Sequence, residues 1–168
     1  MAGERYPLHH RSEVDVAADA RSLFAHLDDH RRLSGHMEKP SLMMAGATMH
    51  VETDALRGQA VGSLIRVTGR VLGMNLVVEE IVTDRVPPSS KTWETLGEPR
   101  LLVIGSYRMG FTISAQGNRS RLVVFIDYQL PPRGLARGLA LVFGRTYAAW
   151  CTRRMASDAV AAMAGVAR

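Results

Sequence analysis

The sequence predicts an α+β protein in which a curved antiparallel sheet packs against one long C-terminal helix. Residues 133–168 show helical spacing of apolar residues and no internal proline, which indicates a long helix. Residues 61–130 alternate between strand and turn patterns, and two short helical segments precede them. A long helix after a run of strands must bury its apolar side, and the sheet is the only large partner available.

The chain of 168 residues is long enough for one domain with a substantial core. Its 46% hydrophobic and 22% charged residues are typical of a globular protein. Residues 1–10 are predicted to be a flexible arm and residues 11–168 a single domain, because no repeat or linker divides the chain. The polar first residues do not resemble a secretory signal, and no window approaches the ~18 apolar residues of a membrane span, so we expect a cytoplasmic protein.

The charge balance of 21 basic and 16 acidic residues gives a net charge of +5. Nucleic acid is still not an expected partner, because the arginines are spread along the chain and only 6% of residues are aromatic. Arg133–Arg145 is basic and apolar, which also suits a helix lying on an anionic membrane. Since we expect the apolar side of this helix to face the sheet, no stable membrane anchoring is predicted and only a transient contact stays open. The sequence leaves the oligomeric state, monomer or homodimer, open.

The first elements follow from short local patterns. Val14 and Val16 alternate with acidic residues in a short strand. Asp19 occupies the N-cap position of a helix that ends near residues 28–29, and a second short helix is predicted for residues 30–37. Nearby methionines either fill an irregular part of the core or line an adaptable pocket mouth; they are Met37, Met43, Met44 and Met49.

Glycine and proline divide the following residues into strands. Residues 62–70 and 74–83 are predicted to form a hairpin centred on Gly73, with Arg66 opposite Glu80. Further strands are predicted for residues 49–53, 91–96, 101–113 and 121–130, with turns at 87–90, 97–99 and 116–118. In the last two strands the apolar residues alternate with polar ones, so one face of each is expected to be buried.

The last helix follows Pro131 and Pro132, which end the sheet. Its predicted buried stripe consists of Leu135, Leu139, Val142, Phe143 and Trp150, with Tyr147 at its edge. Because glycine weakens a helix, we expect the part before Gly144 to be an adjustable cavity cover and the later part to be a fixed clamp. The single cysteine, Cys151, is predicted to be a small buried hydrophobic side chain.

This order of elements resembles the START-like helix-grip fold, the superfamily usually labelled SRPBCC, whose members include birch-pollen-allergen-type proteins and polyketide cyclase/aromatases. Segments similar to its bacterial members are residues 27–30, 61–63, 80–88, 93–94, 97–100, 107–111 and 147–154. The resemblance implies an apolar cavity between the curved sheet and the C-terminal helix. Many members bind lipids, sterols, hormones or polyketides there, and some catalyse cyclisation. No family catalytic motif matches particular positions, so no catalytic residue is predicted.

Candidate ligand-binding residues are taken from the predicted apolar faces and from the predicted cross-strand pair. They are Trp93, Tyr107, Met109, Phe111, Tyr128, Phe143, Tyr147, Trp150, Arg66 and Glu80. Tyrosine and tryptophan combine apolar surface with one hydrogen-bonding group, which suits an amphipathic or aromatic ligand. Simple core filling stays open for each aromatic residue, and an exposed ion pair stays open for Arg66 and Glu80.

Other chemistries find little support. His26 and His30 lie four residues apart on one helix, but the sequence names no third ligand, so no metal is predicted. The chain has neither the Gly-x-Ser-x-Gly elbow of hydrolases nor a glycine-rich phosphate loop, and no cofactor is predicted.

The preferred function is a carrier or sequestering protein for a small hydrophobic ligand, aromatic or lipid-like, without a predicted enzymatic activity. One alternative is a cyclase/aromatase-type enzyme that uses the same cavity; it is favoured if at least two of Arg66, Glu80 and His50 point inside. A second alternative is a protein-interaction or assembly domain, which predicts a cavity too small for a ligand and an exposed apolar patch.

Overall fold

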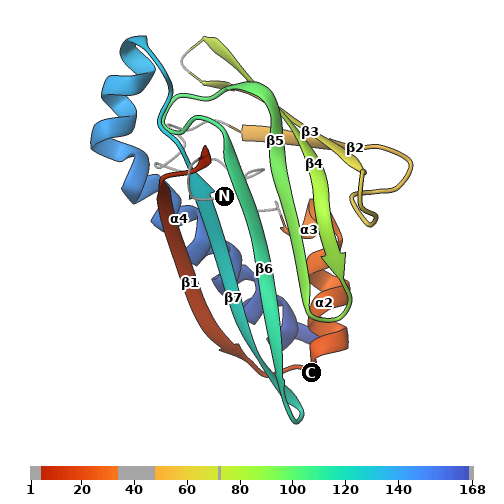
Figure 1. Cartoon of the computed structure of the whole chain (residues 1–168). Coiled ribbons are helices and arrows are strands. Elements are labelled where there is room, and N and C mark those ends of the chain that lie inside the picture. The colour runs from red at the N-terminus through yellow and green to blue at the C-terminus, as the bar shows by residue number, and fades with distance from the viewer. Residues whose placement is uncertain (1–4, 34–47, 72, 167–168) are drawn as a thin grey trace.

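The computed structural model describes residues 5–33, 48–71 and 73–166, and within them one antiparallel sheet carries three helices (Figure 1). The strands are β1 (Leu8–Val16), β2 (Thr48–Thr53), β3 (Leu64–Val71), β4 (Met74–Val86), β5 (Ser90–Arg100), β6 (Tyr107–Gln116) and β7 (Arg119–Tyr128). The helices are α2 (Ala20–Asp28), α3 (His30–Leu33) and α4 (Gly134–Val166). The predicted α+β architecture is confirmed.

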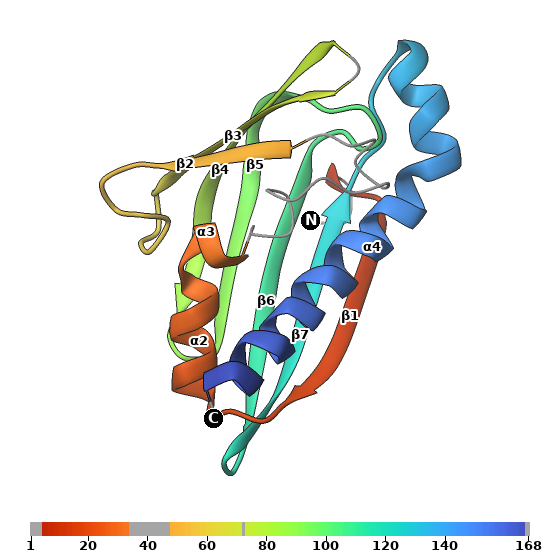
Figure 2. The same cartoon turned by 180° about the vertical axis from the view of Figure 1, so that it is seen from behind.

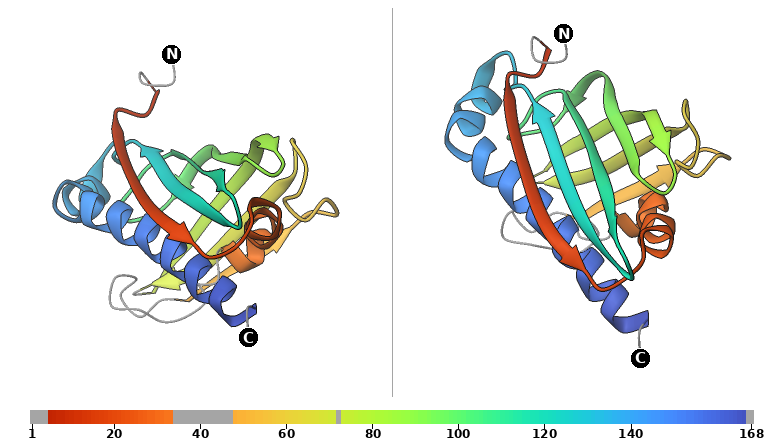
Figure 3. Two further views of the ribbon diagram at one scale, coloured as in Figure 1. Left: turned by 90° about the horizontal axis from the view of Figure 1, so that it is seen from below. Right: turned by 60° about the horizontal axis from the view of Figure 1, so that its bottom comes forward.

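The seven strands lie in the order β1-β7-β6-β5-β4-β3-β2, so the first strand pairs with the last. The sheet curves around α4, which crosses its inner side and packs mainly on β1 and β7 (Figures 2 and 3). Helices α2 and α3 cover another part of the inner side near β2 to β6 (Figure 2). The core therefore lies between the concave face of the sheet and these helices.

The start of α2 is fixed by the predicted N-cap. The carboxylate of Asp19 accepts hydrogen bonds from the backbone N–H groups of Arg21 at 3.0 Å and Ser22 at 3.1 Å. The helix then buries Leu23, Phe24 and Leu27, and ends at Asp28. The second helix is described for His30–Leu33, and the rest of its predicted range, residues 34–37, lies outside the described residues, as do Met37, Met43 and Met44.

Several predicted boundaries are wrong. Strand β1 begins at Leu8, inside the predicted arm, and Tyr6 before it is buried. Strand β5 continues through residues 97–99, where a turn was expected, because Gly97 adopts a positive φ of 63° within the strand. Residues 101–106 alternate like a strand but form a loop before β6.

The register of the β3–β4 hairpin differs from the prediction by one residue. Val71 pairs with Met74, so Arg66 lies opposite Glu79, and Glu80 lies opposite Ile65. A shift of one residue moves a side chain to the other face of a sheet. Arg66 is therefore exposed on the outer face, while Glu80 is buried on the inner face.

The predicted buried stripe of α4 is also wrong in its first half. The buried side there consists of small residues at spacings of four, namely Ala140, Gly144 and Ala148, followed by Cys151, Met155 and Ala159. A side chain at Gly144 would place its Cβ only 3.0 Å from the carbonyl oxygen of Val103, so the helix approaches the 101–106 loop too closely for large residues. The larger apolar residues of this half face solvent instead.

Candidate functional site

A cavity of about 50 Å³ lies between the inner face of the sheet and α4. Most of its walls are apolar, and three methionines take part. Its lining residues are His30, Met49, Val67, Val78, Glu80, Trp93, Leu101, Ile104, Tyr107, Met109, Ile126, Tyr147, Cys151 and Met155.

One wall of this cavity carries a group of polar side chains, Glu80, Tyr107 and His30, which we call the polar trio. The hydroxyl of Tyr107 donates a hydrogen bond to Oε1 of Glu80. The other carboxylate oxygen, Oε2, lies 3.3 Å from Nε2 of His30. The side chains of His30 and Glu80 are only 2% and 3% exposed, so both are shielded from bulk solvent.

The polar trio is not fully satisfied. Within the described part of the chain, Nδ1 of His30 and Oε2 of Glu80 have no hydrogen-bond partner. The contact between Oε2 and His30 is close enough for an ion pair but lacks the alignment of a hydrogen bond. A buried polar atom without a partner costs about 1–3 kcal/mol, so a core with no further role would not favour this arrangement.

Each member of the trio is held by a different element. Glu80 comes from β4, and Tyr107 is the first residue of β6, where its backbone N–H donates to Oγ1 of Thr95 at 3.2 Å. His30 begins α3 and contacts the edge of the Trp93 ring, with ring centroids 5.0 Å apart. Gly58 lies close to the His30 side chain, since a Cβ at position 58 would be 3.2 Å from the Cβ of His30.

Helix α4 closes the cavity opposite the trio with Tyr147 and Cys151. Burial raises the pKa of Cys151 to about 12, and the Glu80 carboxylate adds to this shift. Burial also raises the pKa of Tyr107 and Tyr147, and the charge of Glu80 contributes at both. All three groups are therefore protonated near neutral pH, and Cys151 is not an activated nucleophile.

A buried ionic cluster lies beside the cavity and fastens the end of α2. Asp28 accepts hydrogen bonds from Arg85 at 2.7 and 3.0 Å, and Nζ of the fully buried Lys91 lies 3.3 Å from the Asp28 carboxylate. Burial opposes the charge of Asp28, but the hydrogen bond and charge of Arg85 and the charge of Lys91 outweigh it, so the Asp28 pKa is lowered. Lys91 does not line the cavity, which assigns this cluster a structural role.

The predicted site residues divide into four groups. Five line the cavity: Glu80, Trp93, Tyr107, Met109 and Tyr147. Phe111 is buried beside Phe24 without lining the cavity, and Tyr128 and Trp150 line a separate groove. Arg66 and Phe143 are exposed and line neither of them, contrary to the prediction. His50 is also exposed.

Sequence reasoning missed the role of His30, which was considered only as a possible metal ligand with His26. No group of three or more metal-ligating side chains occurs in the described ranges. The register of β4 could have revealed this role. It turns the carboxylate of Glu80 toward the inner face of the sheet, where a buried carboxylate requires a polar partner.

The separate groove, which we call the cationic groove, is open to solvent and has a volume of about 680 Å³. It lies between β1 and α4 and is lined by His9, His10, Tyr128, Arg145, Thr146, Ala149, Trp150, Arg153, Arg154 and Ser157. Burial and the neighbouring charges of Arg153, His9 and Arg145 lower the pKa of His10. Its lining contains no acidic residue.

Comparison of the sequence with protein-family models and with curated proteins gives no match. Solved structures do match. TTHA0849 from Thermus thermophilus is similar with a TM-score of 0.69 at 11% identity, over 96% of this chain and 100% of that one. Norcoclaurine synthase from Thalictrum flavum, in complex with dopamine and hydroxybenzaldehyde, has a TM-score of 0.63 at 14% identity, over 96% and 88%. Zhui aromatase/cyclase from Streptomyces sp. R1128 has a TM-score of 0.63 at 17% identity, over 95% and 93%.

These similarities extend over nearly the whole chain, although few residues are identical. The chain therefore has the helix-grip fold of these structures, as the order of its elements predicted. None of the described helices is long and apolar enough to cross a membrane.

Proposed function

We propose that this protein binds a small hydrophobic molecule carrying a hydroxyl or phenol group, which it encloses between the sheet and α4. The observation that carries the proposal is the polar trio, with two unpartnered polar atoms on the wall of an otherwise apolar cavity. A ligand hydroxyl can donate to Oε2 of Glu80, and its oxygen can accept from an N–H group of the His30 ring. Apolar surface that leaves water contributes about 25 cal/mol per Å².

The cavity must expand to take such a ligand. A volume of about 50 Å³ holds little more than one water molecule, whose share of liquid volume is about 30 Å³. Met49, Met109 and Met155 line it, and methionine side chains adapt readily to new shapes. The ligand would therefore displace flexible side chains rather than enter an open chamber.

The charge of the trio also predicts which ligands are rejected. Glu80 is a buried carboxylate, and a second negative charge nearby would be strongly unfavourable. We therefore expect neutral hydroxylated ligands to bind better than fatty-acid-like anions. The norcoclaurine synthase structure contains dopamine and hydroxybenzaldehyde, which supports small aromatic molecules as a size class.

The same trio supports an enzyme as the second candidate. An imidazole, a carboxylate and a phenol in one apolar cavity are suitable groups for proton transfer, and an aromatase/cyclase shares the fold. Only Glu80 among Arg66, Glu80 and His50 points inside, however, so the criterion set for an enzyme is not met.

The assembly-domain interpretation predicts a small cavity and an exposed apolar patch, and both occur. It gives no reason for the buried and partly unsatisfied polar trio. We therefore keep ligand binding as the proposed function and treat the exposed patch as a separate surface.

The test compares naphthol, naphthalene and naphthoate by calorimetric titration, because the three share one ring system and differ in the polar group. A hydrogen bond to a charged group contributes about 1.5–3 kcal/mol, so naphthol should bind roughly 10- to 100-fold more tightly than naphthalene. Naphthoate should bind most weakly. Native mass spectrometry of protein purified from its own host should reveal a co-purifying neutral, hydroxylated molecule.

Two adjacent glutamates provide the matched control. Glu80→Gln removes the buried charge and should abolish most of the preference for naphthol over naphthoate. Glu79→Gln changes the exposed neighbour on the outer face and should leave the preference intact. Equal affinity for all three compounds, or unchanged selectivity in Glu80→Gln, would contradict the proposed anchor.

A further inference from the structure

The outward side of α4 carries large apolar residues in its first turns. Leu135, Leu139 and Val142 follow at spacings of four and three, so they lie on one side of the helix, with Phe143 beside them. Leu135, Val142 and Phe143 are 77%, 67% and 50% exposed, and Leu139 is half-buried. We call these four residues the apolar ridge.

The apolar ridge continues into the cationic groove on the same side of the helix. Thr146, Ala149 and Arg153 extend the spacing of four and three beyond Val142, and all three line the groove. The outward side of α4 is therefore apolar in its first turns and basic in the turns that follow.

The charge of this surface has one sign. Residues 130–157 contain five arginines and no acidic residue. Among the described residues, no carboxylate lies within ion-pair distance of Arg145 or Arg153, whereas Arg154 pairs with Asp158 at 3.2 Å. The strand carboxylate of Asp127, next to the groove residue Tyr128, is already paired with His9 and Arg108.

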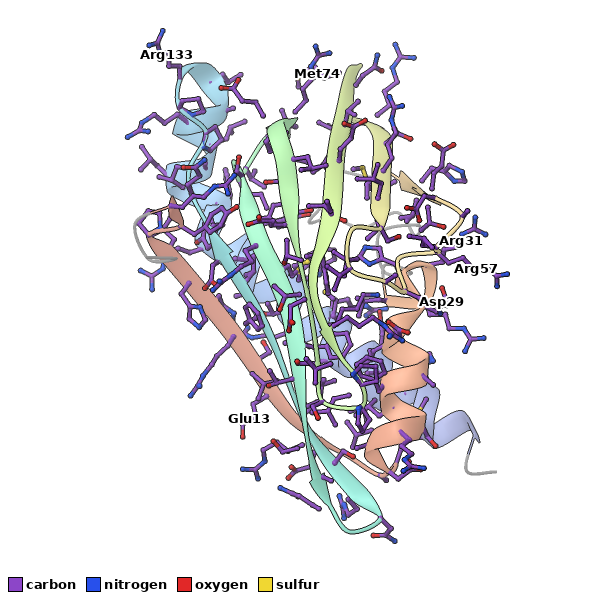
Figure 4. The ribbon with its side chains drawn as sticks, turned by 45° about the vertical axis from the view of Figure 1, so that its right-hand side comes forward. Glu13, Asp29, Arg31, Arg57, Met74 and Arg133 are labelled. Carbon is purple, nitrogen blue, oxygen red and sulfur yellow. The ribbon has the colours of Figure 1, made fainter. Side chains whose placement is uncertain are left out.

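The shape of the molecule makes this surface accessible. The first turns of α4 extend past the start of β1 at one end of the molecule (Figures 1 and 2). Arg133 projects outward from that end (Figure 4). The ridge is therefore open to a partner that approaches this end of the molecule.

We propose that the apolar ridge and cationic groove dock the protein reversibly on a membrane that contains anionic phospholipids. The ridge would enter the interfacial region while the arginines contact headgroup phosphates, which combines the two attractions of interfacial helices. A second copy of this chain fits less well, because pairing two such surfaces would bring arginines together. This proposal goes beyond ligand binding. The two are compatible, because a carrier that docks on a membrane could take up hydrophobic molecules from it.

The test is co-sedimentation with vesicles of phosphatidylcholine and phosphatidylglycerol in equal amounts, against pure phosphatidylcholine. The protein should sediment only with the anionic vesicles, and high salt should release it. Replacing Arg145 and Arg153 together by glutamine should weaken binding about 30-fold, at about 1 kcal/mol per arginine. Leu135→Gln with Phe143→Gln should weaken it by about tenfold or more.

Matched controls change the same residue types elsewhere. Arg21, Arg31 and Arg119 are exposed on other elements, and their replacement by glutamine should leave vesicle binding nearly unchanged. Leu56→Gln and Val86→Gln remove exposed apolar residues away from α4 and should behave likewise. In a Trp93→Phe background, Trp150 in the groove is the remaining tryptophan, and its emission should shift to the blue on anionic vesicles.

Several results would overturn the proposal: no binding to anionic vesicles, equal losses in control and surface variants, or binding that ignores salt. A dimer in sedimentation analysis that dissociates in the ridge variants, without vesicle binding, would assign this face to self-association instead. Naphthol titration of the ridge variants separates the two proposals, because ligand affinity should stay unchanged when docking is lost.

Discussion

Tyr107 and Glu80 join two strands that are not neighbours in the sheet, since the hydroxyl on β6 donates to the carboxylate on β4 across β5. The bond lies inside the apolar cavity, where both side chains are buried. This one hydrogen bond thus links β4 to β6 on the inner face of the sheet, and the same two side chains form part of the polar wall of the cavity.

Removing this hydroxyl should destabilise the protein. Tyr107→Phe leaves Oε1 of Glu80 buried without its donor, so we expect a loss of about 1–3 kcal/mol in the free energy of unfolding, measured by urea titration. Tyr6→Phe is the control, because Tyr6 donates to the partly exposed Glu94 at 3.2 Å. The Tyr6→Phe variant should lose less than about 1 kcal/mol in the free energy of unfolding. Equal losses would mean that the buried bond has no special energetic weight.

Two glycines of α4 should respond in opposite directions. At Gly138 an added Cβ would meet no atom within 4 Å, and Gly138→Leu replaces a poor helix former, so it should stabilise the protein by about 0.5–1 kcal/mol. Gly144→Leu would push against the Val103 carbonyl and the Leu130 side chain, and should cost about 1–3 kcal/mol. Urea titration of both variants measures the difference. Stabilisation at both positions would show that α4 is free to move away from the 101–106 loop.

The Asp28 cluster should make stability depend on pH. The pKa of Asp28 is lower in the folded protein than its unfolded value of about 3.9, so its contribution is present above that pH and is lost as the pH falls through the folded value. Asp28→Asn leaves Lys91 buried without its counter-charge and should cost about 3–5 kcal/mol near neutral pH. The loss of stability between about pH 7 and about pH 3 should be smaller in this variant than in the parent. Asp158→Asn, which breaks only the exposed pair with Arg154, should change stability by ~0.5 kcal/mol.

Cys151 should resist alkylation in the folded protein. Burial raises its pKa to about 12, so little thiolate forms near neutral pH and the side chain is inaccessible. Iodoacetamide labelling followed by mass spectrometry should be slow until the protein is unfolded in urea. Rapid labelling of the native protein would show that the cavity opens frequently, and slower labelling on addition of naphthol would then place the ligand beside α4.

Local sequence signals predicted the arrangement of elements but not their exact phase. The N-cap at Asp19 and the alternation in β7 depend on a few adjacent residues, and both are found in the structure. The pairing of Arg66 with Glu80 failed because the position of a two-residue turn fixes the register, and one residue of error exchanges the faces of the strand.

The phase of α4 failed for a different reason. Large apolar residues at helical spacing usually mark the buried side, but here the close approach to the 101–106 loop admits only Ala140, Gly144 and Ala148. The distance between two elements is a tertiary property that a helical pattern does not contain. His30 was missed similarly, because its partner Glu80 lies far along the chain.

The pairing of β1 with β7 also bears on how the protein is made. Leu8 pairs with Tyr128 and Val16 with Ser120, and α4 then packs on β1. During synthesis on the ribosome, the first strand therefore emerges long before either partner exists. Its edge stays unpaired until β7 and α4 have been synthesised, so the native fold forms only after both have emerged, and long-range contacts of this kind form slowly.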